Sequence, residues 1–89
     1  MTININNNLR ESDLYAKMGQ YDAVGIAEGW LSPESQEEIL VAWQILVDTG
    51  MAWTLQGFFG RAASDLLEQG LIQKGDKSAY TKSRFDKGA

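Results

Sequence analysis

The chain has 89 residues and a net charge of −4, with 44% hydrophobic and 22% charged residues, which predicts one small globular domain rather than a disordered chain. It contains no Cys and no His, so disulfides, the common zinc sites, thiol nucleophiles and imidazole bases are excluded. The longest apolar run, residues 39–47, is broken by Gln44 and is too short to span a bilayer. We therefore expect a cytoplasmic protein, since no secretory signal is visible, that is not an enzyme and binds no cofactor or metal.

Residues 1–10 are predicted to form a flexible N-terminal arm, because a weak alternation of apolar and polar residues runs into a series of Asn. Residues 11–30 have a helical pattern, with Ser12 or Asp13 as the N-cap. Three glycines interrupt this pattern and weaken a continuous helix. The stretch therefore predicts either one kinked helix or two short ones.

The clearest prediction is a helix over residues 33–48. Ser32 is a suitable N-cap, Pro33 suits the first helical position, and glutamates occupy the first turns, where they oppose the positive end of the helix dipole. Apolar residues extend around nearly the whole circumference, including Val41 and Ile45. A helix of this kind is buried on all sides, either at the centre of the domain or by self-association, and we expect a homo-oligomer.

A second helix is expected at about residues 51–69, because Gly50 suits a left-handed C-terminal position and Gly70 ends the next apolar periodicity. The short connection between the two helices implies an antiparallel hairpin or a sharper corner. Small residues along one flank of the second helix indicate close packing against a neighbour. The predicted fold class is thus all-α, a small helical bundle around a central helical hairpin, with residues 11–72 forming a single domain.

Four polar residues lie within the apolar block of these two helices. They are Gln44, Asp48, Gln56 and Arg61. A buried charge or amide must be paired, so we expect an ion pair between Asp48 and Arg61 and an amide contact between Gln44 and Gln56. This polar network would fix the geometry of the hairpin, with partner recognition as the alternative role.

Apolar residues of the two helices are also predicted to form a face for self-association or for a partner. Its members are Val41, Ile45, Trp53 and Phe58. No catalytic, metal or cofactor residues are predicted, because the carboxylates have helix-start or surface explanations and no phosphate-binding glycine loop is present.

Residues 73–89 are predicted to be a basic, flexible tail. Residues 1–73 carry three basic and ten acidic side chains, whereas residues 74–89 carry five basic and two acidic ones. Candidate contact residues in this tail are Lys77, Tyr80, Lys82, Arg84 and Phe85. The acidic body disfavours nucleic acid as a partner, and we expect no membrane partner either.

One alternative arrangement is a winged helix-turn-helix, with the second helix reading DNA and residues 73–85 as the wing. The candidate reading helix carries Asp65 and Glu68 with only Arg61 to offset them, whereas contact with bases and phosphates needs basic or amide side chains.

The block Trp43-Gln44-x-Leu46-Val47-Asp48-Thr49-Gly50-x-x-Trp53-x-Leu55-Gln56-Gly57-x-Phe59-Gly60-Arg61 resembles an element of small uncharacterised proteins from tailed bacteriophages and their hosts. The resemblance covers about residues 40–72 and implies a compact helical accessory protein of viral origin, without assigned catalytic residues. We expect such a protein to bind a host or phage protein, and to inhibit or redirect a host defence or transcription component. The alternatives are a small nucleic-acid-binding regulator and a structural or assembly component.

Overall fold

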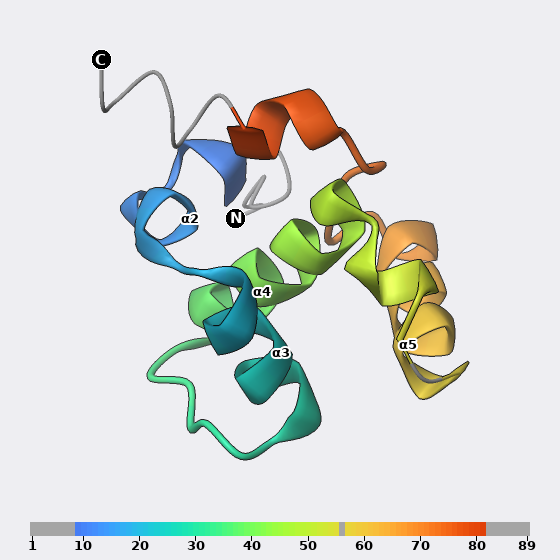
Figure 1. Ribbon diagram of the computed structural model, residues 1–89, viewed down its shortest axis with the longest axis horizontal. Coiled ribbons are helices and arrows are strands. Elements are labelled where there is room, and N and C mark those ends of the chain that lie inside the picture. Colours follow the sequence, from blue (N-terminus) through green and yellow to red (C-terminus); the bar gives the residue numbers. More distant parts are fainter. Residues whose placement is uncertain (1–8, 56, 82–89) are drawn as a thin grey trace.

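The structure, a computed structural model, describes residues 9–55 and 57–81, and within these ranges every regular element is helical (Figure 1). The elements in chain order are η1 (Leu9–Glu11), α2 (Asp13–Lys17), α3 (Gln20–Glu28), α4 (Gln36–Thr49), η2 (Met51–Trp53) and α5 (Gly57–Glu68). Residues 77–81 add a further short helix. The all-α prediction is confirmed. Among the described residues, no helix has the length and apolar character needed to cross a bilayer.

The central element is α4. Its N-cap is Ser35, whose hydroxyl accepts the Glu38 N–H at 3.1 Å, and it ends at Gly50, whose φ of 84° is the left-handed conformation that glycine favours. The predicted start at Pro33 was three residues early, because Ser35 rather than Ser32 satisfies the first amides of the helix. All nine residues from 40 to 48 are buried.

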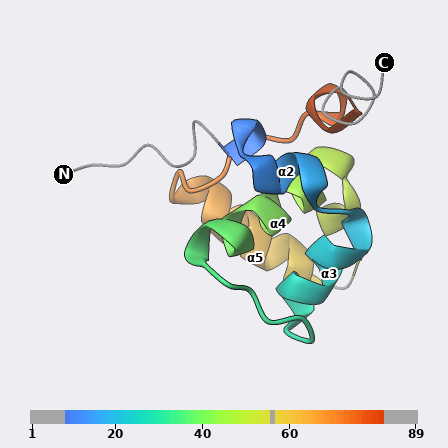
Figure 2. The same cartoon turned by 90° about the vertical axis from the view of Figure 1, so that its left-hand side faces the viewer.

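Helix α4 is covered within a single copy of the chain. Its most extensive contacts are with α3, and η1, α2 and η2 also pack against it (Figures 1 and 2). From α5, the Phe59 ring approaches the Trp43 ring with centroids 5.8 Å apart. Val41 and Ile45 have no exposed surface, so they do not belong to a face for self-association. The nearly all-round apolar pattern of this helix marks the centre of the domain.

The second helix, predicted from about residue 51, begins later: residues 51–53 form the 3-10 helix η2, and α5 begins at Gly57. Trp53 at the end of η2 lies against α5, because a Cβ atom built on Gly60 would be 3.7 Å from its ring. After α5, Gly70 has a φ of 76° and Ile72 returns to the core with 3% exposure. The prediction that Gly70 ends this helix is therefore confirmed.

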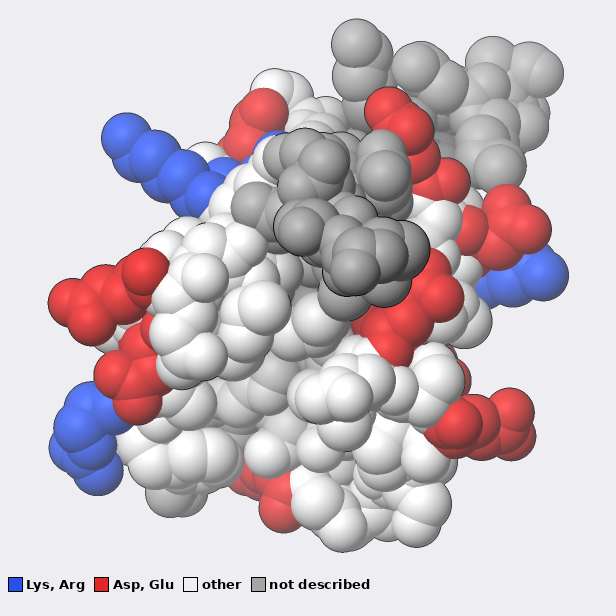
Figure 3. Space-filling model, turned by 180° about the vertical axis from the view of Figure 1, so that it is seen from behind, with Lys and Arg blue, Asp and Glu red and all other residues white. Residues whose placement is uncertain are grey.

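Charged side chains project around the edge of one broad face of the molecule, and uncharged surface lies between them (Figure 3).

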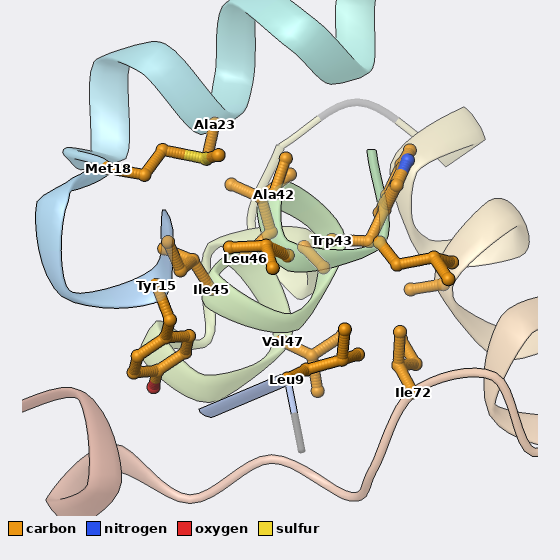
Figure 4. Packing of buried hydrophobic residues seen from close by; sticks show 14 of the residues in the cluster. Leu9, Tyr15, Met18, Ala23, Ala42, Trp43, Ile45, Leu46, Val47 and Ile72 are labelled. Carbon is orange, nitrogen blue, oxygen red and sulfur yellow. The ribbon is translucent and has the colours of Figure 1, made fainter. Parts of the chain in front are cut away.

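Both ends of the described chain take part in the core. Leu9, from η1, is 1% exposed and lies beside Val47 and Ile72 (Figure 4). The part of the predicted N-terminal arm at residues 9–10 is thus packed, whereas residues 1–8 lie outside the described ranges. Gly25 and its neighbours belong to α3, so residues 11–30 form two short helices rather than one kinked helix.

The segment that follows Ile72 runs along the C-terminal end of α4. A Cβ atom on Gly75 would lie 2.5 Å from the Val47 carbonyl oxygen, a distance that only glycine tolerates without a shift of the backbone. Residues 73–81, expected to be part of the flexible tail, are placed against the domain. Residues 82–89 lie outside the described ranges.

Candidate functional site

A buried carboxylate, Asp48, is the centre of the main polar cluster. It lies at the C-terminal end of α4 with 1% exposure. Its Oδ1 atom accepts hydrogen bonds from Arg10 Nη2 (2.7 Å), Gln44 Nε2 (3.1 Å) and the Asp76 backbone N–H (2.9 Å). Its Oδ2 atom accepts from Arg10 Nε (3.0 Å) and the Tyr15 hydroxyl (2.6 Å). We call these five residues the Asp48 cluster.

Gln73 extends the Asp48 cluster toward the C-terminal segment. Its backbone N–H donates to Gln44 Oε1 at 2.7 Å and its carbonyl accepts from Gln44 Nε2 at 2.9 Å. Arg10 donates to the Gln73 side-chain oxygen (2.7 Å) and to the Lys74 carbonyl (2.6 Å). Among the described residues, every buried side-chain nitrogen and oxygen has a partner. The cluster therefore ties three segments, 9–15, α4 and 73–76, into one unit.

Arg10 and Asp76, both in the Asp48 cluster, have shifted pKa values. The hydrogen bond to Asp48 raises the pKa of Arg10 above its ordinary value, so the guanidinium stays charged. Hydrogen bonds from the hydroxyl and the backbone N–H of Ser78, at 2.9 and 3.0 Å, lower the pKa of Asp76 below its ordinary value. Both shifts favour the charged forms, the guanidinium of Arg10 and the carboxylate of Asp76.

The partners of the four predicted network residues differ from those that the sequence suggested. Asp48 forms its ion pair with Arg10, at 2.7 Å, whereas Arg61 is exposed on α5. Gln44 does contact Asp48, but its amide pairs with Gln73, and Gln56 lies outside the described residues. The predicted Asp48–Arg61 pair is therefore corrected. Sequence reasoning missed Arg10, because the fold places it against a residue 38 positions away.

The Asp48 cluster is suited to structure rather than to chemistry. The Asp48 oxygens receive five donors and are almost fully enclosed, which leaves no lone pair facing a substrate. Among the described residues, no group of three or more acidic side chains is arranged to hold a metal ion.

Three hollows lined by described residues differ in their lining. The Trp53 pocket, of about 380 Å³, is lined by Val47, Asp48, Gly50, Trp53, Leu67, Lys74, Gly75 and Lys77. The Tyr21 pocket, of about 320 Å³, is lined by Gln20, Tyr21, Val24, Met51 and Leu55. A third, of about 300 Å³, lies between α2, α3 and the following loop and is lined by Leu14, Lys17, Met18, Asp22, Ile26, Leu31, Ser32 and Glu38.

Among the described residues, four large apolar side chains are exposed, and two of them line these pockets. Tyr21 is 86% exposed and Trp53 is 51% exposed. Trp30, 61% exposed, lines none of the three pockets, and its indole N–H donates to Glu28 at 2.6 Å. Phe58 is 39% exposed. Of the predicted partner face, Trp53 and Phe58 thus reach the surface, unlike the two residues of α4.

The predicted tail contacts are only partly described. Lys77 is exposed and lines the Trp53 pocket. Tyr80 is half-buried, and its ring meets the Tyr15 ring edge-on with centroids 6.2 Å apart. Tyr80 therefore helps to hold residues 77–81 on the domain. Lys82, Arg84 and Phe85 lie outside the described residues.

Comparison with known proteins relates the chain to one family. Residues 22–86 match a family model described as a domain of unknown function, DUF7417. The chain belongs to the DUF7417 family. No curated protein and no solved structure matches it. The DUF7417 match extends beyond residues 40–72, the part of the chain that carries the resemblance to phage proteins. It includes the Trp53 pocket and most of the Asp48 cluster, but begins after Arg10 and Tyr15.

Proposed function

We propose that the chain is a non-enzymatic accessory protein that acts by binding another protein. The observation that carries this proposal is the exposure of Tyr21 and Trp53 beside apolar pockets. Large aromatic side chains that stay exposed beside a hollow are typical of binding surfaces. A partner that covers them removes a large apolar area from water and so gains binding free energy. Neither pocket is lined by a group of side chains arranged for catalysis.

The block at residues 43–61 supports a phage-type protein, because it resembles small proteins of tailed bacteriophages and their hosts. On this proposal the partner is a host or phage protein in the bacterial cytoplasm. Inhibition or redirection of a host defence or transcription component is the specific action that such an origin favours.

Capture from a bacterial lysate, with quantification by mass spectrometry, tests the proposal. We expect the tagged wild-type chain to enrich at least one protein over a tag-only control. The double variant Tyr21→Ala/Trp53→Ala should lose it, whereas Trp30→Ala should keep it, because Trp30 is comparably exposed but lines none of the three pockets. Equal capture by the double variant, or no enrichment by the wild type, would contradict the proposal.

Self-association through exposed residues stays a prediction. With α4 covered inside one copy, its support is the exposure of Trp53 and Phe58. Light scattering on the wild type and on Phe58→Ala tests it: a dimer that dissociates in the variant supports it, and a monomer at high concentration refutes it.

Nucleic-acid binding has weaker support. The described part of the expected wing is coil at residues 73–76 and helix at residues 77–81. A gel shift at low salt, with duplex and single-stranded probes, tests this alternative.

A further inference from the structure

We infer that the Trp53 pocket binds a short acidic segment of a partner protein and receives one apolar or aromatic side chain from it. This inference rests on the proposed function, and it adds the site and the chemistry of the segment that the site recognises. The Tyr21 pocket and the hollow between α2 and α3 do not take part.

The shape and lining of the Trp53 pocket fit a single large side chain. Val47 and Leu67 contribute apolar lining from α4 and α5, and the half-exposed Trp53 ring contributes the aromatic part. A volume of about 380 Å³ is at the lower end of the range of ligand pockets. An aromatic ring or a large aliphatic group that enters here is covered by apolar surface and removed from water.

The charges around the Trp53 pocket select an acidic segment. Lys74 and Lys77 line it, are exposed, and form no ion pair with any described residue. The intervening Asp76 is charged, so residues 74–77 carry a net charge of +1. Asp48, which also lines the pocket, is paired with Arg10. Because residues 1–73 carry ten acidic and three basic side chains, these two lysines form a local basic site on an acidic body. Coulomb attraction therefore favours carboxylates here and disfavours basic segments.

The Asp48 cluster fixes the backbone of residues 74–76, which forms one side of the Trp53 pocket. The Lys74 carbonyl accepts from Arg10, and the Asp76 N–H donates to Asp48. Between these two anchors, Gly75 lies against the end of α4 so closely that a Cβ atom would meet the Val47 carbonyl. The backbone that carries the two lysines is thus fixed before a partner arrives, which reduces the ordering entropy that binding would otherwise cost.

Selection from a random peptide library displayed on yeast tests the inference with the full-length chain as bait. We expect the wild type to enrich peptides in which several Asp or Glu flank an aromatic or large aliphatic residue. The same selection with Trp53→Ala should not enrich them, whereas Trp30→Ala should. Enriched peptides that are neutral or basic would overturn the inference.

Fluorescence anisotropy of one labelled, enriched peptide then measures affinity. Trp53→Ala should raise the Kd by about tenfold or more, as truncation of a central aromatic anchor does. Lys74→Gln/Lys77→Gln should raise it by about fivefold and flatten its dependence on salt, as loss of exposed charge pairs does. Lys17→Gln, a change of the same kind outside this pocket, should leave it unchanged. The lysine variants keep the test valid if Trp53→Ala unfolds.

The outcomes separate this inference from the proposed function. Peptides whose binding is lost in Tyr21→Ala but kept in the Trp53 and lysine variants would overturn the inference and leave protein binding intact. If no peptide is enriched, and an oligonucleotide binds in a gel shift that Lys74→Gln/Lys77→Gln abolishes, both fail.

Discussion

Replacement of Asp48 by Asn tests the role of the Asp48 cluster. The carboxylate accepts five hydrogen bonds, two of them from Arg10. Asn keeps the shape but removes the charge, and it turns one oxygen into an NH₂ group that faces donors. Removing one partner of a buried ion pair costs about 3–5 kcal/mol. Because the Arg10 side chain is 23% exposed, water compensates part of its charge and we expect the lower end, about 3 kcal/mol.

This loss is large for a domain of this size. At about 0.05–0.15 kcal/mol per residue, 89 residues correspond to a total stability of about 4–13 kcal/mol. A loss of 3 kcal/mol lowers the Tm of such a domain by about 12–24 °C. Thermal unfolding followed by far-ultraviolet circular dichroism measures this shift. Asp65→Asn, at an exposed position of α5, is the matched control and should change stability by less than about 0.5 kcal/mol.

A double-mutant cycle with Arg10→Met isolates the ion pair. Arg10→Met/Asp48→Asn should be less destabilised than the sum of the single variants, because no unpaired charge is left in the cluster. A Tm of Asp48→Asn within about 2 °C of the wild type, less than the shift from 1 kcal/mol, would refute the reasoning.

Three further predictions concern the same cluster and its surroundings. Tyr15→Phe removes the hydroxyl that donates to the buried carboxylate and should cost about 2 kcal/mol in urea unfolding, whereas Tyr21→Phe, at an 86% exposed position, should cost nothing measurable. Gly75→Ala should lower the Tm, because its Cβ meets the α4 backbone; an unchanged Tm would contradict that contact. Since the pKa of Asp76 is lowered in the folded state, its contribution is present above pH 3.8, the ordinary value, and is lost as pH falls through the folded pKa. Below that pH, the unfolding free energy of Asp76→Asn should therefore fall less steeply with decreasing pH than that of the wild type. Urea unfolding at a series of pH values measures this, and an equal pH dependence of the two proteins would contradict it.

Local sequence signals were sufficient for the central helix and its end. The apolar residues of α4 and the left-handed Gly50 are recognised from periodicity and from the conformational freedom of glycine. The start of α4 was predicted too early, because Ser32 was the predicted N-cap, whereas the Ser35 hydroxyl is the one that accepts a free amide of the first turn. The nearly all-round apolar pattern did not reveal which neighbours cover α4, since both a sandwiched helix and an oligomer satisfy it.

The polar contacts depended on the tertiary fold. Asp48 needed a cation, and the sequence offered Arg61 in the same block and Arg10 far from it. Spacing along the chain favoured Arg61, but α5 leaves it at the surface while η1 brings Arg10 to the end of α4. The basic tail was likewise judged from composition alone, which carries no information about the close approach of Gly75 to α4. The Trp53 pocket follows from that approach and was not predicted.

The indole N–H signals in a nitrogen–proton correlation spectrum give the most direct test of partner binding at the Trp53 pocket. The chain has three Trp residues, and each lies in a different environment: Trp43 is buried in the core, Trp30 is exposed and does not line the Trp53 pocket, and Trp53 lines the proposed site. On addition of an enriched acidic peptide, we predict that the Trp53 signal shifts while the Trp30 signal stays in place. A shift of Trp30 without a shift of Trp53 would contradict this account.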